Sequence, residues 1–347
     1  MQPVETVEPV AEAPVRSAAA FQTKRAARKY WIILAVVTAL GLLAAFGLLA
    51  YGNPMPVGTE QFWLLAERRL EAVIAMLIVA FCHSFATVAF QTVTNNRIIT
   101  PSIMGFEALY TALHTATVYF LGITGLMEAR SMQTFLVQLV LMIGFSLVLY
   151  GWLLTGNKGN IHAMLLVGIV IGGGLGSLST FMQRLLTPSE FDVLTARLFG
   201  SVNNAEAEYF PISIALIAIA CIGIYGMSRK LNIISLGRDA TTNLGLNHRR
   251  ISILTLIFVT ILMAVSTALV GPMSFLGFLV ATLAYQFADT YDHRYILPMS
   301  LSIAFMVMTC AYFVMNHIFY AQGVVSIIIE LVGGSVFLFV ILRKGRL

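Results

Sequence analysis

Long apolar runs separated by short polar segments dominate this chain. A helix rises 1.5 Å per residue, so about 20 residues cross a hydrocarbon core of about 30 Å. Ten candidate spans lie at 30–51, 70–91, 103–121, 132–154, 161–183, 210–228, 251–270, 274–288, 295–315 and 324–342. The eighth run is short and predicts a tilted or partial helix. The pattern predicts an all-α, polytopic membrane protein of about ten transmembrane helices.

Composition supports this class. Of the 347 residues, 59% are hydrophobic and 11% are charged, whereas a soluble domain typically has about 25% charged residues. The cysteines Cys82, Cys221 and Cys310 all lie in apolar runs, without the spacing of a disulfide framework or a metal site. We therefore expect no metal in this chain. We also expect no nucleic-acid partner, because the basic residues are spread over the loops.

The loops also predict the orientation. Residues 1–29 are rich in Pro, Ala and Glu, end in "KRAARK", and are predicted to form a disordered cytoplasmic tail before a membrane domain at 30–347. With that tail inside, 16 of the 21 Lys and Arg residues fall in inside segments and 5 outside. The positive-inside rule then places both termini in the cytoplasm, together with the polar segment 229–250.

Ten spans divide into two five-helix halves of opposite topology, as in transporters built from inverted repeats. A faint similarity links residues 85–105 with residues 275–300. Each stretch runs from an apolar helix through polar residues to a helix that begins near a proline.

Four stretches of the chain resemble the permease subunits of ABC importers for iron–siderophores, haem and cobalamin. They are "VAFQTVTNNRIITPSIMGFEA" (88–108), "SLGRDATTNLGLNHRRI" (235–251), "VGPMSFLGFLVATLAYQ" (270–286) and "DHRYILPMS" (292–300). The resemblance extends from about residue 30 to the end. It implies a type II ABC importer fold.

The first stretch carries the family pattern with one change. Gln91, Asn96, Pro101 and Gly105 stand at matching positions, and Arg97 replaces a proline. The third stretch departs further, because the family often has Pro-His and then an arginine at the positions of Ala281, Thr282 and Tyr285. This departure resembles a branch that serves siderophores, often with two different permease subunits per transporter.

The resemblance implies a role for the polar segment 229–250, which would form two short helices and dock into a cleft of an ATP-hydrolysing subunit. Gly237 and Gly245 supply turn points in this segment. The residues expected to contact that subunit are Leu236, Gly237, Arg238, Asp239, Ala240, Leu244, Gly245, Arg249 and Arg250. The alternative is an ordinary basic loop, which explains the charges but not the Leu-Gly pairs at both ends.

The fifth run, "GIVIGGGLGSLSTFMQRLL", is rich in small residues that permit close helix approach, and its hydroxyl groups can line a water-filled path. The resemblance places this run beside the translocation path, between two permeases, and places the cytoplasmic gate near Gln91 and Asn96. The residues expected to line the path are Gly172, Gly173, Gly174, Ser177 and Thr180. Packing within the subunit is the alternative, and the two interpretations are compatible.

Arg68 and Arg69 precede the second span on the outer side. By resemblance, they would receive acidic residues of a substrate-binding protein; alternatively, they anchor the helix end among lipid headgroups. Glu107 and Glu330 lie within spans, where a carboxylate costs roughly 2.5–3.5 kcal/mol, so both should face protein or water. We interpret them as packing residues, with a role in proton coupling as the alternative.

The chain has no G-x-x-x-x-G-K-[ST] loop, so ATP and Mg are expected in a partner subunit. The sequence therefore predicts a permease subunit of a bacterial inner-membrane importer for ferric siderophore, with no enzymatic activity of its own. The expected partners are a pair of ATP-binding subunits, a second and different permease, and a periplasmic or lipid-anchored substrate-binding protein. The alternatives are a haem or cobalamin permease, an ion-driven secondary transporter, and a membrane enzyme or scaffold, for which no catalytic motif is found.

Overall fold

The computed structural model describes residues 19–51, 55–56, 58–128, 131–155, 161–317 and 325–344. Within these residues it contains helices and no strand, which confirms the all-α prediction. The α-helices are α1 (Lys24–Ala50), α2 (Glu60–Thr94), α3 (Phe106–Glu128), α4 (Met132–Thr155), α5 (Ile161–Gln183), α6 (Pro188–Leu198), α7 (Phe210–Gly226), α8 (Ser228–Ile234), α9 (Arg238–Asn243), α10 (His248–Val270), α11 (Ser274–Ala288), α12 (His293–His317) and α13 (Val325–Lys344). Short 3-10 turns occur at η1 (Pro101–Met104), η2 (Val202–Asn204) and η3 (Ala207–Tyr209).

Each of the ten predicted spans coincides with one helix: α1 to α5, α7, and α10 to α13. Among the described residues, six helices are long and apolar enough by themselves to cross a membrane. Helix α11 has only 15 residues, as its short apolar run predicted. Helix α3 is interrupted at Gly122, whose φ of 70° is not helical.

Helix α1 begins within the segment predicted to be a disordered tail. The Thr23 side chain accepts a hydrogen bond from the backbone N–H of Ala26 at 3.1 Å, and this N-cap starts the helix at Lys24. The basic end of the predicted tail is therefore helical, and residues 1–18 lie outside the described residues.

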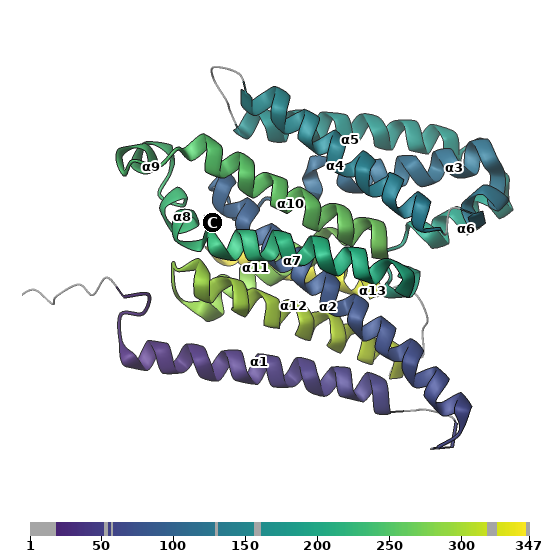
Figure 1. The fold of residues 1–347 in the computed structure, drawn as a ribbon, viewed down its shortest axis with the longest axis horizontal. Helices are drawn as coiled ribbons and strands as arrows, with labels where there is room; N and C mark the ends of the chain where they lie inside the picture. Colours follow the sequence, from purple (N-terminus) through teal and green to yellow (C-terminus); the bar gives the residue numbers. More distant parts are fainter. Residues whose placement is uncertain are drawn as a thin grey trace, which may run out of the picture.

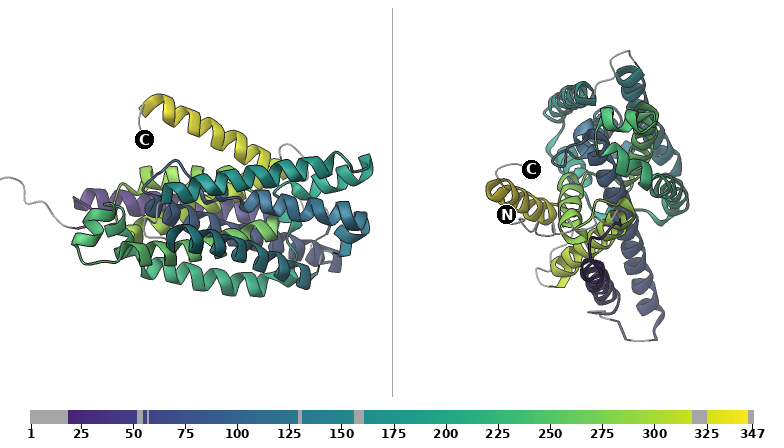
Figure 2. Two further views of the ribbon diagram at one scale, coloured as in Figure 1. Left: turned by 90° about the horizontal axis from the view of Figure 1, so that it is seen from above. Right: turned by 90° about the vertical axis from the view of Figure 1, so that its left-hand side faces the viewer.

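The helices lie side by side with α2 near the middle (Figure 1). Helix α2 is buried along most of its length from Ala75 onward and packs against α10 and α12. Helices α3 to α6 form one flank, and α1 forms the other, where it lies against α12. Helix α13 diverges from the bundle at an angle (Figure 2).

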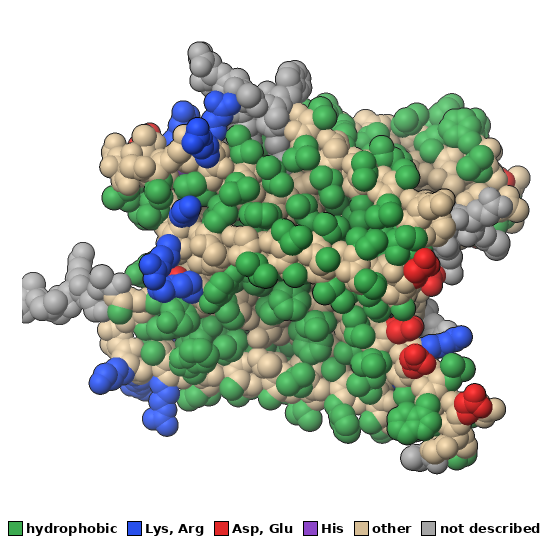
Figure 3. Space-filling view, viewed as in Figure 1, with side chains coloured by type: hydrophobic (Ala, Val, Ile, Leu, Met, Phe, Trp, Pro, Cys, Tyr) green, Lys and Arg blue, Asp and Glu red, His purple; other side chains and the backbone are tan. Residues whose placement is uncertain are grey.

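Polar contacts identify which helix ends lie together. Thr92, at the end of α2, contacts His293, at the start of α12, at 2.7 Å. At the opposite end of α2, Arg69 donates to the carbonyl oxygen of Tyr51, just after α1, at 2.9 Å. On the face drawn in Figure 3, most Lys and Arg side chains gather at the end that holds α8 and α9, and most Asp and Glu side chains gather at the other.

The similarity between residues 85–105 and 275–300 does not reflect an inverted repeat. Both stretches turn at the end of the bundle where Thr92 meets His293, whereas an inversion would place corresponding turns at opposite ends. Opposite topology of the two halves rests instead on the alternating directions of the ten helices.

Close backbone packing after α6 gives a test of the fold. A Cβ on Gly200 would overlap the carbonyl oxygen of Pro272, which is backbone and cannot rotate away. We expect Gly200→Ala to destabilise the protein by about 1–3 kcal/mol, the usual cost of overpacking. Thermal unfolding in detergent measures this, with Gly226→Ala as the control, because a Cβ there meets no atom within 4 Å. Equal melting temperatures for the two variants would contradict the packing.

Candidate functional site

The segment 229–250 forms two short helices, α8 and α9, as expected from the resemblance. Gly237 joins them with a φ of 94° and Gly245 follows with a φ of 77°, which are conformations that favour glycine. The buried hydroxyl of Thr241 donates to the carbonyl oxygen of Gly237 at 2.7 Å and lies 3.2 Å from that of Ile233. These contacts hold α9 against α8 and make the segment a compact unit.

The outer surface of this unit is unusual for a polar segment. Leu236 and Leu244 are 63% and 60% exposed. The charged residues around them, Arg238, Asp239, Arg249 and Arg250, are also exposed, and Ala240 is half-buried. Two exposed leucines among charged groups form a surface suited to a protein partner, because aliphatic anchors within a polar rim are typical of interfaces.

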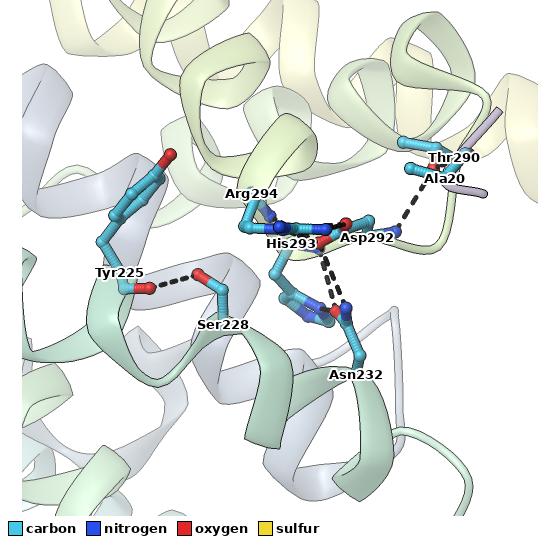
Figure 4. Close-up of polar contacts among 8 residues, drawn as sticks. All are labelled: Ala20, Tyr225, Ser228, Asn232, Thr290, Asp292, His293 and Arg294. Carbon is cyan, nitrogen blue, oxygen red and sulfur yellow. Dashed lines mark hydrogen bonds and ion pairs between the residues drawn. The ribbon is translucent and has the colours of Figure 1, made fainter. Parts of the chain in front are cut away.

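Polar side chains connect α8 to the start of α12 (Figure 4). The Asn232 side chain donates to Asp292 Oδ1 at 3.1 Å and accepts from the backbone N–H of His293 at 2.9 Å. Arg294 forms an ion pair with Asp292 at 2.6 Å. Burial raises the pKa of Asp292, but hydrogen bonds from Arg294 and Asn232 lower it more, so the pKa lies below its ordinary value and the carboxylate is charged at neutral pH.

The two residues expected at the gate both shape the loop after α2. Gln91 is 2% exposed and its Nε2 donates to the carbonyl oxygen of Arg97 at 2.7 Å. Asn96 Oδ1 accepts from the backbone N–H of Ile98 at 2.9 Å, which stabilises a turn. In this conformation Gln91 faces the protein interior.

The two departures from the family pattern lie against each other. The guanidinium of Arg97 sits 4.6 Å from the centre of the Tyr285 ring, a distance at which a cation is attracted to an aromatic face. This contact joins the loop after α2 to α11. The sequence marked both positions as unusual but gave no sign that they meet.

Helix α5 has two different faces. Gly172 packs closely, since a Cβ there would lie 3.4 Å from the Cα of Gly105. Around Gly173 and Gly174 the side is open, with no atom within 4 Å of an added Cβ, and Ser177 and Thr180 are exposed. A hollow of about 510 Å³ is lined by Gly173, Gly176, Ser177, Thr180, Phe181 and Arg184.

Arg68 and Arg69 have different surroundings. Arg69 Nη1 donates to the carbonyl oxygens of Leu48 at 3.2 Å and Tyr51 at 2.9 Å, so it stabilises the C-terminal end of α1. Arg68 is exposed. The structure thus gives Arg69 a structural role and leaves Arg68 accessible.

The two intramembrane glutamates also differ. Glu107 accepts from the Ser274 hydroxyl at 2.5 Å, and its other oxygen is buried without a hydrogen-bond partner among the described residues. Glu330 is exposed on α13. Within the described part of the chain, no group of three His, Cys, Asp or Glu residues could hold a metal ion.

Comparison with known proteins places this arrangement in a family. The sequence model of the FecCD transport family matches residues 31–343. The chain belongs to the FecCD transport family. The match runs from within α1 to within α13 and includes all four sequence stretches, which confirms their family resemblance.

Individual relatives agree with this assignment. The chain is 56% identical to the petrobactin import system permease protein FatC of Bacillus anthracis, over 96% of this chain and 94% of the relative. It is 23% identical to the petrobactin import system permease protein FatD of the same organism, over 92% of each. A solved structure described as an inward-facing metal-chelate type ABC transporter matches with a TM-score of 0.76 and 19% identity, over 91% of this chain and 99% of that one, and supports the fold.

Three residues of this region, Thr92, Asn232 and His293, received no role from the sequence, although Thr92 and His293 lie within the family stretches 88–108 and 292–300. No local signal could have identified Asn232, because its partners are about 60 residues away in the chain.

Adjacent glycines on α5 test its two faces. We expect Gly172→Leu to lower the melting temperature of the purified subunit in detergent, because the new side chain collides with the backbone at Gly105. Gly173→Leu should leave the melting temperature unchanged or raise it, since its side is open and leucine favours helix. A loss of similar size in both variants would show that the two faces are not distinct.

Proposed function

We propose that this chain is a permease subunit of an ABC importer that moves a ferric siderophore of the petrobactin type across the bacterial inner membrane. The observation that carries the proposal is the 56% identity to a petrobactin import permease over nearly the whole length of both chains. Uptake assays in proteoliposomes with ferric petrobactin, haem and cobalamin test the substrate. Uptake of haem or cobalamin instead of the siderophore would select the alternative permeases.

The open face of α5 and the exposed face of α13 are the surfaces that a second permease would cover. Glu330 is exposed on the apolar helix α13, and Arg184 is exposed in the turn directly after α5. An ionised group facing lipid is costly. A path between two subunits would place both groups in contact with water or protein instead of lipid. The existence of two petrobactin permeases, FatC and FatD, in one organism supports a second permease that differs from this chain.

The unit formed by α8 and α9 would bind a separate ATP-binding subunit, which would hold ATP and Mg. Its exposed leucines, Leu236 and Leu244, would enter a cleft of that subunit. This end of the bundle carries most of the basic side chains on the face in view, which supports a cytoplasmic location for it and for both termini (Figure 3). The opposite end would face a periplasmic or lipid-anchored substrate-binding protein.

Leu244→Asp tests the contact with the ATP-binding subunit. A charge in place of the exposed leucine should prevent its burial, so recovery of that subunit in a gentle detergent pull-down should fall at least tenfold, which is about 1.4 kcal/mol. Asn243→Asp adds the same charge one residue away, keeps the leucine, and should retain the subunit.

Full recovery with Leu244→Asp would contradict the proposed contact. A chain that purifies alone and transports in vesicles with an ion gradient would instead identify a secondary transporter, in which Glu107 becomes the first candidate for the coupling group.

The adjacent arginines Arg68 and Arg69 separate docking from structural support. We expect Arg68→Ala to weaken stimulation of ATP hydrolysis by the substrate-binding protein at low salt while leaving the melting temperature unchanged, because exposed ion pairs are screened by salt. Arg69→Ala should lower the melting temperature, because α1 loses its partner at Leu48 and Tyr51. Unchanged stimulation in Arg68→Ala at low salt would exclude that residue from docking.

A further inference from the structure

A chain of buried and half-buried side chains joins the α8–α9 unit to the inner end of α2. His293 lies at its centre, 3% exposed. Its Nδ1 lies 2.6 Å from Asn232 Oδ1 on α8, and its Nε2 lies 2.7 Å from the Thr92 hydroxyl on α2. Since the Asn232 oxygen is an acceptor, Nδ1 carries the proton that it shares with Asn232.

Asp292 fixes the orientation of the Asn232 amide. The Asn232 Nδ2 group donates to Asp292 Oδ1 at 3.1 Å, so its oxygen must face His293. Asp292 is itself held by Arg294. Both hydrogen-bonding edges of Asn232 are therefore directed at the start of α12.

The next link leads from Thr92 to the gate region. Thr92 is 6% exposed and lies in the last turn of α2, beside Gln91. Gln91 holds the carbonyl oxygen of Arg97, and Arg97 lies over the Tyr285 ring on α11. A displacement at Thr92 therefore reaches the loop after α2 and the inner end of α11.

We propose that Asn232, His293 and Thr92 form a bridge that transmits movement of the α8–α9 unit to the inner end of α2, with His293 as the central positioning residue. This inference rests on the proposed function, because it needs a nucleotide-driven subunit that moves the unit. Apolar packing of Leu231 also holds α8 in the core, but apolar contacts tolerate sliding. Hydrogen bonds require a fixed distance and angle, and a buried polar group that loses its partner is strongly disfavoured.

A purely structural role would predict a different outcome, namely a less stable protein whose helices still respond together. The test therefore needs a readout of movement at α2. Ile98 is exposed in the loop after α2 and provides it. In the complete complex, with Cys82, Cys221 and Cys310 replaced by alanine, Ile98→Cys is labelled with a maleimide with and without a non-hydrolysable ATP analogue.

We expect the analogue to change the labelling rate by about fivefold or more, the lower range of measured couplings between sites. Thr92→Val, which matches threonine in shape but lacks the hydroxyl, should reduce this response to less than about twofold on the same scale. Thr92→Ser keeps the hydroxyl and should restore it. The Thr92 hydroxyl also lies 2.8 Å from the Val88 carbonyl oxygen within α2, an alternative acceptor for its single proton, so Asn232→Ala must give the same loss from the other end.

The double variant decides between a bridge and two unrelated defects. If Thr92 and Asn232 act through His293, Thr92→Val with Asn232→Ala should lose no more of the response than either change alone. A full response in Thr92→Val with the ATP-binding subunit still bound would overturn the bridge. If the labelling rate in the parent complex does not change with the analogue, the proposed function is wrong. If the rate changes but the complex takes up no ferric siderophore, only the proposed substrate is wrong.

Discussion

A polar group within hydrocarbon must find its partner inside the protein, and this constraint organises the whole molecule. It explains why each predicted span is a helix, whose backbone groups bond within the segment. It also explains where the polar side chains lie. Many serine and threonine hydroxyls within the helices donate to carbonyl oxygens one turn earlier, as Thr94 does to Phe90 and Ser179 does to Leu175.

The same constraint distinguishes the helices that are covered within one chain from those that leave polar groups exposed. Helices α2 and α10 bury most of their apolar span within the subunit, and α12 buries half of its own. Helix α5 leaves glycines and hydroxyls uncovered, and α13 exposes a carboxylate. The exposed polar groups of these two helices are not covered within one chain, and the proposed path between two permeases would surround them with water or protein.

The sequence predicted the helices well, because a span is a local property of about 20 residues. It also located the segment of α8 and α9, whose glycines fix turns locally. The sequence did not predict the contacts between distant segments. No residue near Arg69 in the sequence indicates that it caps α1, and none near Asn232 indicates its contact with His293. Gln91 was predicted to lie at a gate, but its hydrogen bond to the carbonyl oxygen of Arg97 was not predicted. Such pairings depend on how helices pack, and packing is a property of the whole chain.

The contact between Arg97 and Tyr285 makes the two positions dependent on each other. The face of an aromatic ring attracts the Arg97 guanidinium, whereas an arginine at 285, which the family resemblance gives for this position, would place a second cation beside it. A hybrid chain that took residue 97 from this protein and residue 285 from such a relative would therefore bring two like charges together at the inner end of α11, although neither parent contains that pair.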